Sequence, residues 1–225
     1  MSNKDLNEKQ WLAIKNDIYE KALEEEKKLH YHEGSIYPDF YEEIKKLGFE
    51  FEIGMQLENI CRENPEITKN IILKYYKKSI CDDEKGFLMA CLINKKHKDL
   101  IPFFIEEFYK YEKANRDWAG NCLIQTADVK YIEEYILMLK DSKLGDSRIY
   151  IIETVEKLKT NQKEIIPSLI KLLNDDILRL SALKALSKYK EPSLLSYFEK
   201  YKNDKSSDIR NVAKKAIANI EKLSK

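Results

Sequence analysis

The sequence predicts an all-α protein built from helix pairs that repeat about every 31 residues. The 225 residues include only 6 Gly and 5 Pro, too few for the many tight turns of a β-sandwich or β-barrel. Charged residues make up 35% of the chain and hydrophobic residues 43%, a mixture typical of amphipathic helices. A short motif that begins with a basic residue also recurs at a nearly constant spacing, which indicates an internal repeat.

The N-terminal stretch differs from the rest of the chain. Residues 6–31 predict one long, highly charged helix whose apolar side includes Trp11 and Leu12. Terminal units of a repeat array need a polar outer face. We therefore expect an N-terminal capping helix over residues 1–35 and a single continuous array over residues 36–225.

The repeat is clearest in the second half of the chain. The aligned segments begin at Lys85, Arg116, Arg148, Arg179 and Arg210, and a weaker match begins at Gly54. Counted from the first residue of each segment, positions +3, +6 and +7 carry apolar or small side chains. This spacing places them on one face of a helix, so we expect them in the core. Cys91 and Cys122 occupy position +6 and are explained as small core residues.

Each of these helices is preceded by another amphipathic stretch, most clearly at residues 100–108 and 165–173. Pro102 and Pro167 have the same place in the two stretches, which predicts that each lies in the first turn of its helix, where proline is tolerated. The short links contain Asp and Ser residues, such as Asp175, that can cap the following helix. The result is about six helix pairs, each of which buries its apolar stripe against its neighbours.

Two C-terminal segments resemble the second half of a HEAT repeat. They are residues 172–186 (LLNDDILRLSALKAL) and 207–217 (SDIRNVAKKAI), and the resemblance extends over about residues 98–223. It implies a right-handed α-solenoid of about six HEAT-like helix pairs with a concave inner surface. Such arrays serve many unrelated functions, so the resemblance is specific for the architecture and not for the activity.

We expect the binding residues on the inner surface formed by the second helix of each pair. If positions +3, +6 and +7 face the core, positions +1 and +5 face solvent. At +1, Ile149 and Leu180 are apolar, which indicates either a protein-binding patch or coverage by neighbouring helices. The predicted contact row consists of Asp117, Trp118, Asn121, Ile149, Glu153, Leu180 and Lys184, with apolar anchors in the middle and polar residues around them.

The remaining polar motifs have structural explanations. The four repeated arginines are expected to bond loop Asp residues or carbonyl groups of adjoining repeats, with an anion track as the alternative, and Asp146 and Asp176 are the nearest acidic partners. The set His30, His32 and Glu33 is too local for a metal site, and His97 is expected in a loop. We expect no metal, no cofactor and no catalytic residue.

These features favour a non-catalytic adaptor that binds a protein partner on its concave surface. The chain shows no signal-peptide pattern, no run of about 18 apolar residues and no CxxC spacing, and its net charge is +1. We therefore expect a cytoplasmic monomer without a membrane or nucleic-acid partner. By analogy with small HEAT-like chains, one concrete form of the adaptor is a bacterial immunity protein that binds a toxin.

The alternative is a DNA glycosylase of the HEAT-like AlkD type, or another nucleic-acid-binding protein. Enzymes of that type use Trp, Asp and Arg in a concave cleft, which this chain offers as Trp118, Asp117 and Arg116. Such an enzyme needs an aromatic wall for an extruded nucleotide, a carboxylate that stabilises a developing sugar cation, and a basic group that holds phosphate. The near-neutral net charge does not favour a duplex-binding protein.

Overall fold

The computed structural model describes residues 17, 20, 21, 24, 34–52, 54–110, 113–158, 160 and 162–223. The regular elements within these ranges are α-helices and short 3-10 helices, without a strand, so the predicted all-α class is confirmed. Asp17, Glu20, Lys21 and Glu24 are helical, and Lys21 pairs with Asp17 at 2.8 Å. The rest of the predicted capping helix, including His30, His32 and Glu33, lies outside the described residues.

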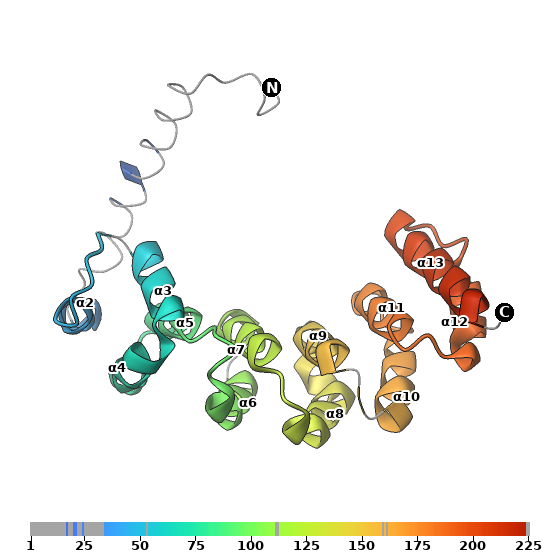
Figure 1. Cartoon of the computed structure of the whole chain (residues 1–225), viewed down its shortest axis with the longest axis horizontal. Helices are drawn as coiled ribbons and strands as arrows, with labels where there is room; N and C mark the ends of the chain where they lie inside the picture. The colour runs from blue at the N-terminus through green and yellow to red at the C-terminus, as the bar shows by residue number, and fades with distance from the viewer. Residues whose placement is uncertain are drawn as a thin grey trace. The chain divides into compact units, whose positions relative to one another are not determined.

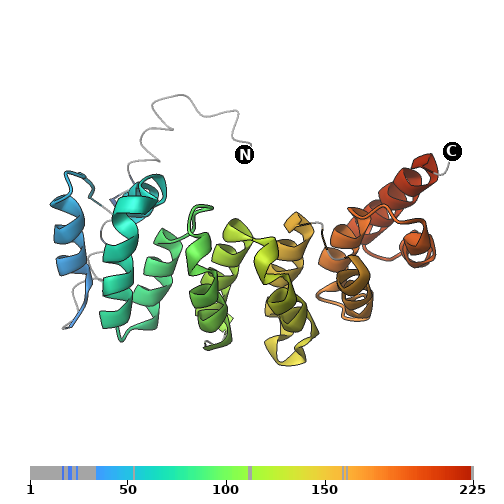
Figure 2. The same ribbon diagram turned by 60° about the horizontal axis from the view of Figure 1, so that its bottom comes forward.

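The chain divides into two compact units, Met1–Leu92 and Ile93–Lys225. The helices described in the first unit are α2 (Tyr37–Lys45), α3 (Gly54–Glu63), α4 (Pro65–Lys78) and α5 (Asp82–Cys91). Helix α4 packs against α2, α3 and α5, and Figure 2 shows these helices side by side. The single continuous array over residues 36–225 stays a prediction.

Apolar side chains hold the first unit together around one buried acid. Phe40, Ile44 and Leu57 are fully buried, and ring contacts join Phe40 to Tyr75. The buried Glu84 carboxylate accepts hydrogen bonds from the Ser79 hydroxyl and from other groups, including the backbone N–H of Ile36 at 3.0 Å. A buried charge needs such donors, so Glu84 fastens the segment before α2 to the start of α5.

The second unit consists of helix pairs. Its α-helices are α6 (Ile101–Lys110), α7 (Lys113–Thr126), α8 (Ile132–Lys140), α9 (Arg148–Leu158), α10 (Gln162–Leu172), α11 (Arg179–Ser187), α12 (Leu195–Tyr201) and α13 (Ser207–Leu223). Short 3-10 helices precede four of them: η1 (Lys98–Leu100), η2 (Val129–Tyr131), η3 (Ser142–Ser147) and η4 (Pro192–Leu194). Each even-numbered helix packs against the helix that follows it.

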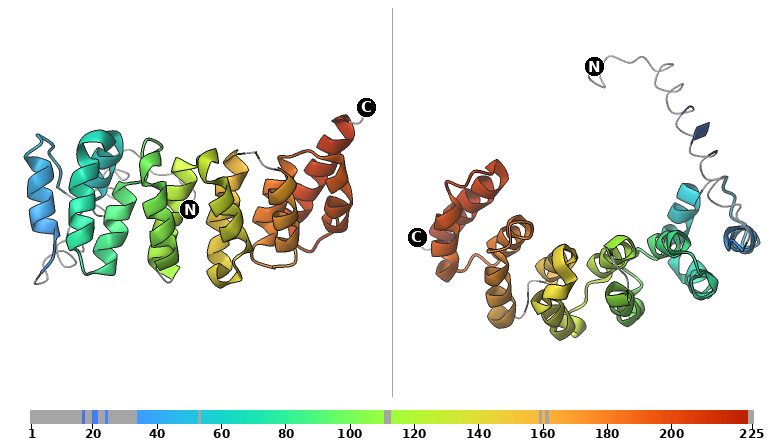
Figure 3. Two further views of the ribbon diagram at one scale, coloured as in Figure 1. Left: turned by 90° about the horizontal axis from the view of Figure 1, so that it is seen from below. Right: turned by 180° about the vertical axis from the view of Figure 1, so that it is seen from behind.

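The second unit has two rows of helices (Figures 1 and 3). Helices α7, α9, α11 and α13 are successive neighbours in one row, and α6, α8, α10 and α12 form the other. The predicted core positions lie between the rows. The side chains at +3, such as Ile151 and Ala182, and those at +6, such as Cys122, are fully buried. At +7, Leu123 is fully buried, whereas Ile217 is half-buried.

One helix start differs from the prediction. Pro102 is the second residue of α6, as predicted, but Pro167 lies inside α10, which already begins at Gln162. The helix includes the polar residues that precede Pro167. Because proline has no backbone N–H, one hydrogen bond is absent inside α10 and not in its first turn. The predicted capping by link residues is not found at α11, whose N-cap Leu178 makes no side-chain cap hydrogen bond. The Asp175 side chain instead accepts from the backbone N–H groups of Ile177 and Leu178, within the link before the helix.

Candidate functional site

The contact row lies on three successive helices of the second unit. Asp117, Trp118 and Asn121 belong to α7, Ile149 and Glu153 to α9, and Leu180 and Lys184 to α11. These helices are neighbours in the same row, because α9 packs against both α7 and α11. The structure therefore places the seven residues on three adjacent helices, and none of them belongs to the fully buried core.

The apolar members of the row are the least expected on a surface. Trp118 is 38% exposed, and Ile149 and Leu180 are half-buried. Glu153 and Lys184 are exposed, whereas Asp117 and Asn121 are half-buried. Neighbouring helices thus cover Ile149 and Leu180 only in part. A partner that covers these side chains completely would gain from the removal of their remaining apolar surface from water.

Tyr150, which was not in the predicted row, fixes how α9 lies on α7. The Asp117 carboxylate lies close enough to the Tyr150 hydroxyl to affect its titration. Burial, and then the negative charges of Asp117 and Glu153, raise the pKa of Tyr150 to about 12. The Tyr150 ring lies over Gly120, where an added Cβ would overlap the ring. Gly120 and Tyr150 therefore allow a close approach of the two helices.

The repeated arginines bind backbone carbonyl groups. The Nε–H groups donate to carbonyl oxygens near the end of the preceding helix or in the link: Arg116 to Phe108 at 2.9 Å, Arg148 to Gly145 at 3.0 Å, and Arg179 to Leu173 at 2.8 Å. Arg210 donates through Nη1 to the carbonyls of Asp204 and Lys205 at 2.7 and 2.8 Å. The predicted bonding to carbonyl groups is found, but these carbonyls belong to the same helix pair as the arginine and not to an adjoining repeat. Carbonyls that a helix end leaves unpaired gain a donor in this way.

The acidic partners of the arginines agree only in part with the prediction. Asp176 pairs with Arg179, as expected. The carboxylate that Arg148 contacts is Asp175 in the next link, at 3.3 Å, whereas the expected partner Asp146 is exposed. The link before α11 therefore lies near the start of α9. The prediction considered only acids close to each arginine in sequence, and Asp175 is not close to Arg148 in sequence.

Lysines join successive helices of the row in a repeated way. Lys157 of α9 donates to the carbonyl of Ile124 in α7 at 2.9 Å, and Lys188, just after α11, pairs with Glu156 of α9 at 3.4 Å. In both cases a lysine at position +9 contacts position +8 of the preceding helix in the row. The signal for this contact in the sequence is the recurrence of lysine at position +9, as Lys157 and Lys188.

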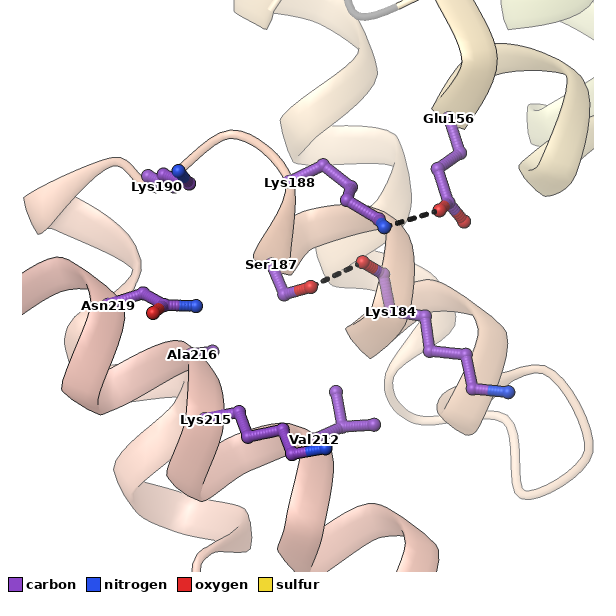
Figure 4. Close-up of a pocket in the computed structure, with 9 residues that line it drawn as sticks. All are labelled: Glu156, Lys184, Ser187, Lys188, Lys190, Val212, Lys215, Ala216 and Asn219. Atoms are coloured by element: carbon purple, nitrogen blue, oxygen red, sulfur yellow. Dashed lines mark hydrogen bonds and ion pairs between the residues drawn. The ribbon is translucent and has the colours of Figure 1, made fainter.

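A pocket of about 600 Å³ opens between α11 and α13. Figure 4 shows its lining, with Lys188 turned toward Glu156 and the side chains of Asn219 and Lys215 extending from α13 toward α11. The lining residues are Glu156, Lys184, Ser187, Lys188, Lys190, Val212, Lys215, Ala216 and Asn219. Only Lys184 belongs to the contact row, although the equivalence of Lys184 and Lys215 at position +5 was visible in the sequence.

The described residues provide no evident metal centre. Nowhere in the described ranges do three or more His, Cys, Asp or Glu side chains come together in a way that could hold a metal ion. His97 lies in a loop, as predicted, and is buried. Among the helices of the described part, none has the length and apolar character needed to cross a membrane.

Comparison with known proteins adds no relative to this description. The chain matches no family model, no curated protein and no solved structure.

Proposed function

We propose that this chain is a non-catalytic scaffold that binds a protein partner on the surface of α7, α9 and α11. The observation that carries the proposal is the contact row, in which an exposed Trp118 and the half-buried Ile149 and Leu180 lie among polar side chains on three adjacent helices. Aromatic and aliphatic anchors surrounded by a polar rim are the usual composition of a protein interface.

The proposed architecture is a right-handed α-solenoid with HEAT-like helix pairs. Its support is the spacing of about 31 residues between equivalent helices, together with packing that joins each helix mainly to its neighbours. The repeated arginine-to-carbonyl bonds add to this support, because the same contact recurs in successive pairs. In such an array the row of second helices forms the inner, concave surface.

The concrete form that we propose is a cytoplasmic, monomeric bacterial immunity protein whose partner is a toxin. It rests on analogy with small HEAT-like chains and on the length of the array. The polar groups of the contact row are also engaged in ways that suit a rigid binding surface. The Asn121 amide donates to the backbone carbonyl of Asp117 at 3.0 Å.

The test is a double substitution of the two apolar anchors. The partner is first captured from a lysate of the native host, identified and purified, and its affinity for the wild type is then measured. Ile149→Asp with Leu180→Asp should weaken binding more than about 30-fold, because it places charge where apolar anchors are covered. The melting temperature should change by only about 2 °C, since both side chains are partly exposed.

The matched control carries the same chemical change on other surfaces. Leu137 and Ile177 are 63% and 61% exposed, so Leu137→Asp with Ile177→Asp adds the same charge outside the contact row. The control should bind the partner as the wild type does. Equal binding by both double variants would overturn the proposed surface. A large fall in melting temperature for the first variant alone would show that Ile149 and Leu180 belong to the core.

An AlkD-type glycosylase is the second candidate, favoured by the exposed Trp118 beside Asp117. Arg116 supports this candidate less, because its Nε–H already donates to the Phe108 carbonyl and is not available to bind phosphate. A wild-type protein that releases no base from alkylated DNA would exclude this candidate. Release that is lost in Asp117→Asn would establish it and overturn the scaffold.

A further inference from the structure

The pocket between α11 and α13 lies where the repeated lysine contact is interrupted. At the two preceding interfaces of the row, a lysine at position +9 reaches position +8 of the neighbouring helix. At the α11–α13 interface the equivalent residues are Asn219 and Ser187, and both line the pocket. The Ser187 hydroxyl donates instead to the carbonyl of Lys184 at 2.7 Å, within its own turn. The shorter Asn219 leaves open the space that a lysine bridges elsewhere.

The pocket is strongly basic. Four lysines line it, namely Lys184, Lys188, Lys190 and Lys215, against a single acid, Glu156, which is already paired with Lys188. The ammonium groups of Lys184, Lys190 and Lys215 form no ion pair with any residue that the structure describes. They come from α11, from the link after it and from α13, so three separate segments contribute lysines to the pocket lining. In Figure 4 the Lys184 side chain extends away from α13.

The pocket also offers groups other than charge. Val212 and Ala216 provide apolar surface on the α13 side, and the Asn219 amide and Ser187 hydroxyl provide neutral polar contacts. A carboxylate fits this combination, because its two oxygens accept hydrogen bonds from several donors while its methylene stem contacts apolar surface.

We propose that this pocket binds carboxylate side chains of an acidic segment of the protein partner. The inference rests on the proposed scaffold function and names the chemistry of the partner. Lys184 belongs to both the contact row and the pocket, so one partner segment lies across the two. Along the row, position +5 changes from Asn121 and Glu153 to Lys184 and Lys215, which confines positive charge to the pocket end.

This charge pattern favours a protein over a nucleic acid. A nucleic-acid strand presents phosphates at regular intervals and needs a continuous basic track. Beyond the pocket, the same row of helices presents Asp117 and the exposed Glu153, which repel phosphates. A protein segment satisfies the pattern with acidic residues at one end and apolar residues at the other.

The test uses fluorescein-labelled hexaglutamate and fluorescence anisotropy at low salt. The pocket variant is Lys190→Glu with Lys215→Glu. The control, Lys163→Glu with Lys171→Glu, has the same net charge and places the change on exposed positions of α10, outside the pocket lining. We expect the pocket variant to bind about tenfold more weakly than the wild type, and the control to bind within about twofold.

A variant with an unchanged net charge tests whether the pocket itself, and not the overall positive charge nearby, binds the peptide. Asn219→Trp fills the opening without changing the net charge, and it should also weaken hexaglutamate binding. Circular dichroism and urea denaturation of every variant verify that the fold is retained.

The proposal is overturned if the pocket variant and the control bind the peptide equally, or if Asn219→Trp binds as the wild type does. It is also overturned if heptathymidylate, whose phosphodiesters equal the side-chain carboxylates of hexaglutamate in number, binds more tightly than hexaglutamate with an amidated C-terminus. None of these outcomes affects the proposed scaffold, which is tested separately by the substitutions at Ile149 and Leu180 with the purified partner.

Discussion

Arginine side chains join each second helix of the second unit to the helix before it. The guanidinium of Arg179 is the most heavily engaged: it donates to the Leu173 carbonyl, pairs with Asp176, and lies over the Tyr201 ring at 5.8 Å. A lysine has no planar fork and cannot make all these contacts at once. The basic residue that marks the repeat in the sequence is therefore explained by the backbone carbonyls that it serves.

Removal of Arg179 should therefore destabilise the protein. We expect Arg179→Ala to lower the free energy of unfolding by about 1.5–3 kcal/mol, because the carbonyl of the buried Leu173 loses a charged donor. Arg179→Lys should fall between the wild type and Arg179→Ala. Urea denaturation provides the measurement, with Lys171→Ala on the exposed side of α10 as a control that changes stability by less than about 0.5 kcal/mol. Equal effects of Arg179→Ala and the control would contradict the structural role.

Helix contacts in the row depend on small residues at defined places. Gly120 of α7 lies against the ring of Tyr150 in α9, and fully buried small side chains at position +6, such as Cys122 and Ala185, occur in the same row. The repeat predicted which helices exist and which positions are buried, because burial follows the helical period. It did not predict that Gly120 faces Tyr150, since the period says nothing about which residues of two neighbouring helices meet.

An added methyl group at Gly120 tests this contact. Alanine stabilises an exposed helical position by about 1 kcal/mol relative to glycine. At Gly120 we expect the opposite sign, a loss of about 1–3 kcal/mol in urea denaturation, because the new Cβ overlaps the Tyr150 ring. Gln125→Ala, at an exposed position of the same helix, should be nearly neutral. A Gly120→Ala variant more stable than the wild type would show that α7 and α9 lie further apart.

At the scale of the whole chain, both units contain tyrosines with raised pKa values. Burial is the main cause at Tyr75 in the first unit and at Tyr150 and Tyr189 in the second, and it raises each pKa to about 12. An unfolded tyrosine has a pKa near 10. Between about pH 10 and 12 the folded state therefore keeps protons that the unfolded state has lost. The stability from these groups is complete below pH 10 and decreases as the pH rises through 12.

Tyr189 gives the cleanest measurement of this effect. Its hydroxyl is buried without a hydrogen-bond partner among the residues described, so Tyr189→Phe removes the titrating group and little else. We expect Tyr189→Phe to be at least as stable as the wild type at pH 7, because an unsatisfied buried hydroxyl is lost. In urea denaturation between pH 9 and 11.5, its free energy of unfolding should decrease less steeply with pH. Parallel slopes would contradict the raised pKa.

The basic pocket marks the limit of what the sequence predicts. Lys184 was identified because it occupies a solvent-facing position of the repeat, and Lys215 has the same position one repeat later. Lys190 follows the end of α11, at a left-handed backbone position with φ of 54°, which no periodic pattern indicates. The opening itself depends on Asn219 and Ser187, which are 32 residues apart. At the two preceding interfaces a lysine at position +9 contacts position +8, and Asn219 and Ser187 do not make this contact.

Because the pocket lies between α11 and α13, a ligand bound in it should affect how often α13 opens. One wall comes from α13, which packs mainly against α11 and α12, so a local opening that releases α13 breaks contacts with these two helices and leaves the rest of the unit in place. A ligand held between α11 and α13 binds only the closed arrangement. At a hundred times its dissociation constant, it raises the free energy of that opening by about 2.7 kcal/mol. The amide hydrogens of α13 would then exchange with solvent about a hundredfold more slowly, so the pace of exchange in this helix measures how much of the pocket is filled.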